Sequence, residues 1–101
     1  QVSTVEKTVR IAFAKTPILI AIAKCESDFR QYKNGKPLRN AEGSSAVGVM
    51  QIMYSVHHKS ARSLGLNLNT TEGNLAYAKY LYRNEGTRPW KSSIHCWSSP
   101  E

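Results

Sequence analysis

The sequence predicts a single small domain that is mainly α-helical, or α+β by a narrow margin, with one short hairpin. Apolar residues recur at helical spacing in several stretches that begin with a capping residue. The dipeptide Asn34-Gly35, set between short mixed segments, is the strongest hairpin signal in the chain. The 101 residues suffice for one modest core, so we expect residues 1–101 to form one domain.

Two helices are expected in the N-terminal third. The first is predicted over residues 3–15, where Ser3 and Glu6 fit a capping box. Thr16 followed by Pro17 signals the start of the second, because Thr can cap free N–H groups and Pro suits a first turn. The 3.6-residue period then places four residues of the second helix on one stripe: Leu19, Ile22, Ala23 and Glu26.

Glu26 is the candidate functional residue of this second helix. A carboxyl group on an apolar stripe is partly desolvated, which disfavours its charged form and raises its pKa. A raised pKa is what a general acid needs in order to hold a proton near neutral pH. The alternative interpretation is a solvated Glu on a last helical turn with no chemical role.

Further elements follow in the second half of the chain. Ser44 or Ser45 is expected to cap a short helix that carries Met50 and Met53, three residues apart. Ser55 is the predicted cap of the next helix, with its end at the glycine of position 65. The last long helix is expected to be capped by Thr70 or Thr71 and to end before Gly86. Its inner stripe is expected to consist of Asn74, Leu75, Ala78, Leu81 and Tyr82.

The net charge of +7 comes from basic residues that are scattered and never form a block of four. A diffusely cationic surface attracts polyanions of any kind. No nucleic-acid motif accompanies the charge, so we expect no nucleic-acid partner. No apolar run reaches the length of a membrane span, and the opening residues are neither a signal peptide nor a start Met, which is typical of a processed mature domain.

The two cysteines, Cys25 and Cys96, are compatible with one disulfide, and the alternative is two free thiols in a reducing compartment. A bridge closing so long a loop stabilises a fold by ~4 kcal/mol on the chain-entropy model. It would clamp the C-terminus to the helix of Glu26 and favours a secreted or periplasmic location.

His57 and His58 are adjacent and point in different directions on a helix, so we expect no metal site there, and no cofactor.

Three motifs considered together resemble the soluble-type lytic transglycosylases, a family with a lysozyme-like fold that cleaves peptidoglycan. They are E-S-x-F at 26–29, G-V-M-Q-I-M at 48–53 and N-L-x3-K-Y-L at 74–81, in family order and at family-like separations. The resemblance covers roughly residues 18–81. It implies a helical domain whose catalytic acid ends a helix beside a glycan cleft, with the small hairpin or loop next to that cleft.

The resemblance also implies roles for individual residues. Glu26 matches the catalytic acid, Gln51 and Met53 match cleft residues, and Asn74 matches a cleft-lining Asn. The family Ser before the G-x-M-Q motif corresponds to Ser44 in preference to Ser45. The C-terminal Tyr of many relatives has no clear counterpart, and three residues are candidates to replace it: Tyr80, Tyr82 and His95. Tyr80 is also a candidate for sugar contact, as are Tyr32, Tyr54, Tyr77 and Trp90.

A transglycosylase needs one acid/base residue, whereas a hydrolase of the usual kind needs two carboxylates. Glu42 follows the predicted hairpin, where a second carboxylate would sit, so a hydrolytic lysozyme is one alternative. A non-catalytic cationic module that binds cell walls is another. The leading prediction is a monomeric lytic transglycosylase that cuts the MurNAc–GlcNAc bond of peptidoglycan strands, with Glu26 as single acid/base.

Overall fold

Helices dominate the computed structural model, which describes residues 2–40 and 42–98. The mainly α class predicted from the sequence is confirmed, and two small antiparallel hairpins accompany the helices. The elements in chain order are α1 (Thr4–Ala12), α2 (Pro17–Ser27), β1 (Tyr32–Lys33), β2 (Lys36–Pro37), β3 (Ala46–Val47), β4 (Ile52–Met53), α3 (Tyr54–Ser63), α4 (Thr71–Glu85), the 3₁₀ helix η1 (Arg88–Ser93) and α5 (Ile94–Trp97).

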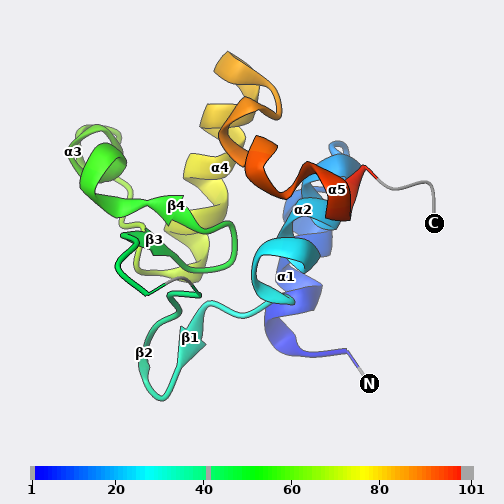
Figure 1. Ribbon diagram of the computed structural model, residues 1–101, viewed down its shortest axis with the longest axis horizontal. Coiled ribbons are helices and arrows are strands. Elements are labelled where there is room, and N and C mark those ends of the chain that lie inside the picture. Colours follow the sequence, from blue (N-terminus) through cyan, green and yellow to red (C-terminus); the bar gives the residue numbers. More distant parts are fainter. Residues whose placement is uncertain (1, 41, 99–101) are drawn as a thin grey trace.

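Helix α4 lies between two groups of elements (Figure 1). On one side are α1, α2 and α5, and on the other are α3 and the second hairpin, β3–β4. The chain leaves α4, turns through η1 and returns to α2, so that α5 packs beside α2. The buried apolar side chains of both groups form one continuous core, with Phe13, Leu19, Met50 and Tyr77 among its largest fully enclosed members.

The helix starts agree only partly with the capping predictions. Ser3 accepts a hydrogen bond from the Glu6 amide, and Thr70 caps α4 through the Gly73 amide, as expected. Thr16 makes no capping hydrogen bond, although α2 begins at Pro17. The N-cap of α3 is Met53 instead of the predicted Ser55, and α1 ends at Ala12, before Lys15.

The short helix predicted to carry Met50 and Met53 is wrong, because residues 46–53 form the hairpin β3–β4. Val47 pairs with Ile52, and the turn between them closes with a hydrogen bond from the Gln51 amide to the Gly48 carbonyl, at 3.1 Å. The two methionines have opposite environments, since Met50 is fully buried and Met53 is 43% exposed. The predicted Asn34-Gly35 turn is present and joins β1 to β2.

Two buried amide side chains explain why this segment is a hairpin. Gln31 accepts a hydrogen bond from the Val49 amide, and Asn74 accepts one from the Met50 amide, both at 2.9 Å. The side-chain nitrogens of Gln31 and Asn74 both donate to the Leu68 carbonyl. The Asn74 nitrogen also donates to the Val47 carbonyl. Backbone N–H groups that a helix would bond internally are therefore satisfied by side chains of the core.

Gly48 lies against these two amides with no space for a side chain. Its φ is +77°, and a Cβ there would lie 2.5 Å from both the Asn74 amide nitrogen and the Gln31 amide oxygen. Gly65 has nearly the same φ, +76°, but no atom lies within 4 Å of the corresponding position. Both glycines therefore have a positive φ that disfavours a side chain, but only Gly48 lacks the space for one.

We predict that Gly48→Ala lowers the free energy of unfolding by about 3 kcal/mol or more, whereas Gly65→Ala lowers it by about 1 kcal/mol. The smaller value is the cost of a left-handed alanine, and the difference is the cost of displacing Gln31 and Asn74. Urea denaturation of both variants measures the difference. Equal losses would contradict a close contact between Gly48 and the buried amides.

Candidate active site

Glu26 lies in the last turn of α2, on the stripe that the sequence predicts. Leu19, Ile22 and Ala23 of that stripe are fully buried, and the Glu26 side chain is half-buried where the stripe reaches the surface. Desolvation by burial raises the pKa of the Glu26 carboxyl above its ordinary 4.5, and a hydrogen bond from Ser93 opposes part of this effect. The raised pKa has the direction that a general acid requires.

Ser27 and the two residues after it fix the position of Glu26 at the helix end. The Ser27 hydroxyl donates to the Ala23 carbonyl and accepts from the Arg30 amide. Asp28 and Phe29 then both adopt positive φ, at 54° and 62°, which reverses the chain at once. Left-handed backbone is costly for residues other than glycine, so the surrounding contacts must hold it in place. The E-S-x-F motif thus ends the helix directly after the acid.

Ser93 brings the C-terminal segment onto this acid. Its hydroxyl donates to Glu26 Oε2 at 2.6 Å, and the Trp97 indole N–H donates to Ser93 Oγ at 3.0 Å. The structure contains the predicted disulfide between Cys25 and Cys96, whose Cα atoms are 6.0 Å apart. Because each cysteine directly precedes a residue of this network, the disulfide holds α5 beside the end of α2.

Ser93 can satisfy Glu26 in either protonation state. The hydroxyl donates to the carboxylate when Glu26 is ionised. When Glu26 carries a proton, the carboxyl can donate to Ser93 Oγ, and the hydroxyl can turn to the Trp90 carbonyl, 3.1 Å away. Trp97 can donate to Ser93 Oγ in both cases. The network suits a group that loses and regains a proton.

Asn40 links Glu26 to the second hairpin. Its side-chain amide donates to the Glu26 backbone carbonyl, and its backbone N–H donates to Gln51 Oε1 at 3.3 Å. The Gln51 amide nitrogen donates to the Leu38 and Gly48 carbonyls. Gln51, predicted to bind substrate, therefore also braces the hairpin toward the acid, and its backbone has a positive φ of 48°.

A groove with a volume of about 360 Å³ opens beside this hairpin. Gln51 and Met53 line it from the hairpin, and Trp90 lines it from η1. Trp90 also connects the groove to the acid, because its indole N–H donates to the Met50 carbonyl and its own carbonyl accepts from Trp97 and lies within hydrogen-bond distance of the Ser93 hydroxyl. His57 and Glu85 also line the groove, where burial lowers the pKa of His57 and the Glu85 charge opposes that shift.

The remaining predicted site residues fall in three kinds of place. Ser44 lies next to the groove residue Met53, with its hydroxyl 3.7 Å from the sulfur. Tyr80 packs against Tyr77 with ring centroids 5.4 Å apart, and is not among the groove residues.

Asn74 is fully buried, so the predicted contact with substrate is corrected to a positioning role through its hydrogen bond from the Met50 amide. Glu42 is exposed, two positions after Asn40.

Sequence reasoning missed Ser93 and Asn40. Ser93 had a signal, because it stands one helical turn before Cys96 and the predicted disulfide attaches that turn to the neighbour of Glu26. No sequence signal indicated a role for Asn40, since an asparagine in a loop is common in any protein. In residues 2–40 and 42–98, no three His, Cys, Asp or Glu side chains come together as a metal site.

No family model, curated protein or solved structure matches this chain. Its function is therefore inferred from the chemistry of its own residues. A half-buried carboxyl with a raised pKa and a hydroxyl that can serve both of its protonation states are features of general acid/base catalysis.

The raised pKa of Glu26 has a consequence for stability. The folded state binds the proton more tightly than the unfolded chain, so the free energy of unfolding must fall as pH rises from about 4.5 through the folded-state pKa. Glu26→Gln removes this dependence. We predict that wild type loses stability relative to Glu26→Gln across that range, as measured by urea denaturation at several pH values. A wild-type free energy of unfolding that stays constant or rises relative to that of Glu26→Gln across this range would contradict desolvation of the carboxyl.

Proposed function

We propose that this chain is a lytic transglycosylase that cleaves the glycan strands of peptidoglycan, with Glu26 as the single general acid and base. The observation that carries the proposal is the desolvated Glu26 carboxyl, paired with Ser93 at the end of α2. The three motifs that resemble this family support it, because two of them supply Glu26 and the groove residues Gln51 and Met53.

The reaction requires one group that first gives and then takes a proton. Glu26 protonates the GlcNAc oxygen as the bond from that oxygen to MurNAc C1 breaks. The MurNAc acetamido group stabilises the positive charge that develops on the sugar. The C6 hydroxyl then attacks C1, its proton returns to Glu26, and a 1,6-anhydro end forms without consuming water. The alternating hydrogen bonds of Ser93 accommodate both halves of this cycle.

The groove, which Trp90 and Ser93 connect to Glu26, has features of a sugar site. Met53 exposes an apolar surface there and Gln51 contributes a polar group, while Trp90 is buried beneath the groove and supports its floor. Sugar rings bind on such surfaces through their apolar faces and through a few fixed polar partners. The braces from Gln31 and Asn74 hold the hairpin that forms this wall, which limits the entropy lost when a glycan binds.

The charge and the disulfide support an extracytoplasmic role. The net charge of +7 attracts the carboxylates and phosphates of a cell wall and should make binding weaken in salt. A disulfide is typical of an oxidising compartment. Within residues 2–40 and 42–98, no helix has the length and apolar character that crossing a bilayer requires. The proposed location is the periplasm or outside the cell, and the proposed state is a monomer.

Hydrolysis with Glu42 as second carboxylate is the competing chemistry. It has one observation in its favour, because Asn40 contacts the Glu26 carbonyl and so places the start of the Glu42 segment beside the acid. Glu42 itself is exposed and forms no ion pair within the described residues. The single-residue mechanism needs only groups already in contact with Glu26.

We predict that Glu26→Gln reduces release of soluble fragments from purified peptidoglycan at least about 100-fold, because the proton donor is lost. Glu42→Gln is the matched control and should retain activity within about twofold. Mass spectrometry of the wild-type products should show 1,6-anhydro ends, which are lighter than reducing ends by one water molecule.

Two results would contradict the proposal. Reducing ends together with loss of activity in Glu42→Gln would identify a two-carboxylate lysozyme. Absence of fragments from wild type, together with co-sedimentation of the protein with walls, would identify a binding module without turnover.

A further inference from the structure

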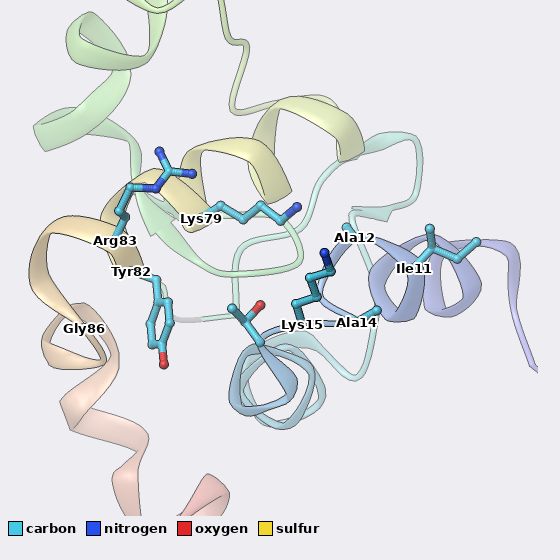
Figure 2. Close-up of a pocket in the computed structure, with 9 residues that line it drawn as sticks. Ile11, Ala12, Ala14, Lys15, Lys79, Tyr82, Arg83 and Gly86 are labelled. Atoms are coloured by element: carbon cyan, nitrogen blue, oxygen red, sulfur yellow. The ribbon is translucent and has the colours of Figure 1, made fainter.

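A second cavity lies at the opposite end of α2 from Glu26. It has a volume of about 940 Å³ and is formed by the end of α1, the start of α2 and one face of α4 (Figure 2). Because α2 has 11 residues, this cavity and the Glu26 carboxyl are separated by roughly 15 Å of helix. The cavity is therefore distinct from the proposed glycan groove.

Three cationic side chains surround the cavity. Figure 2 shows Lys79 and Arg83 from α4 and Lys15 from the segment after α1. The only ion pair in residues 2–40 and 42–98 joins Arg10 to Glu6, so these three cations have no acidic partner there. Among the residues that the structure describes, none that lines the cavity is acidic. Three like charges gathered around one concavity repel one another, and an anion bound among them would relieve that repulsion.

The start of α2 adds uncompensated positive character. Pro17 opens the helix, its first turn contains no acidic residue, and Thr16 gives it no side-chain cap. Thr16 lines the cavity, and its Oγ1 is buried without a hydrogen-bond partner. The Thr16 hydroxyl is enclosed by the protein, so the contribution of this helix start to the cavity is its backbone N–H groups and its positive end.

The remaining walls are apolar and larger than an inorganic anion needs. Ala12, Ala14 and the ring of Tyr82 line the cavity beside Ile11, whose side chain is 78% exposed. A ligand that fills this space has an uncharged body as well as an anionic group. A single aromatic ring does not make the row of stacking surfaces that single-stranded nucleic acid uses, which favours a ligand without bases.

We propose that this cavity binds phosphate esters, with Lys15, Lys79 and Arg83 around the phosphate, and that its ligand is a polyol-phosphate polymer. Arg83 can contact two phosphate oxygens at once, and the lysines act as point charges. The choice of a polyol-phosphate polymer rests on the proposed function, because such polymers would be met at a cell wall. The phosphate site itself does not depend on that function.

Binding of a synthetic glycerol phosphate hexamer, measured by calorimetry at about 0.1 M salt, tests the proposal. We expect Lys79→Gln/Arg83→Gln to weaken binding at least about tenfold. The control Lys7→Gln/Lys59→Gln removes the same charge from exposed positions that line none of the cavities described here, and should weaken binding less than about threefold. Equal weakening by the two pairs would overturn the site and leave only diffuse attraction.

Amide chemical shifts of wild type, followed during titration with inorganic phosphate, give a test without substitution. We expect shifts at residues 15–19 and 79–86, and none around Glu26. Shifts spread over the whole surface would overturn the proposal. A thymidylate hexamer that binds these residues as tightly as the glycerol phosphate hexamer would overturn the polyol-phosphate ligand. None of these measurements needs turnover, so a protein that cleaves peptidoglycan but fails them contradicts this site alone.

Discussion

The disulfide between Cys25 and Cys96 is the constraint on which the candidate site depends. It joins the residue before Glu26 to the residue before Trp97, and so holds the C-terminal turn on the end of α2. Ser93 of this turn reaches the carboxyl with its hydroxyl. The same enclosure that positions Ser93 also removes water from Glu26, and this loss of solvation raises the pKa.

The second hairpin is tied to the same acid from the other side. Buried amides of Gln31 and Asn74 fix its turn, and Gln51 and Asn40 connect that turn to the Glu26 backbone. Each connection uses a polar side chain whose partners are backbone groups, which is how irregular loops become rigid inside a small core. The groove wall and the acid are thus parts of one hydrogen-bonded unit, although they are far apart in sequence.

Local patterns predict what depends on neighbours in the chain. The period of α2, the Asn34-Gly35 turn and the cap at Thr70 are such features, and the structure has all three. Residues 46–53 were mispredicted as helical because the spacing of Met50 and Met53 fits a helix, whereas the buried amides that impose the hairpin come from distant segments. The role of Asn74 was misread for the same reason, since a sequence match does not distinguish a side chain that lines a cleft from one that holds the cleft in place.

We infer that burial lets Glu26 keep a proton at a pH where an ordinary glutamate has lost it. The most direct measurement is the titration of the Glu26 side-chain carboxyl carbon in the wild-type protein, followed by NMR from acid to neutral pH. We expect a midpoint above the ordinary value of 4.5, because burial outweighs the Ser93 hydrogen bond. A midpoint at or below that value would contradict it, since the carboxyl would then be a solvated anion with no proton to give.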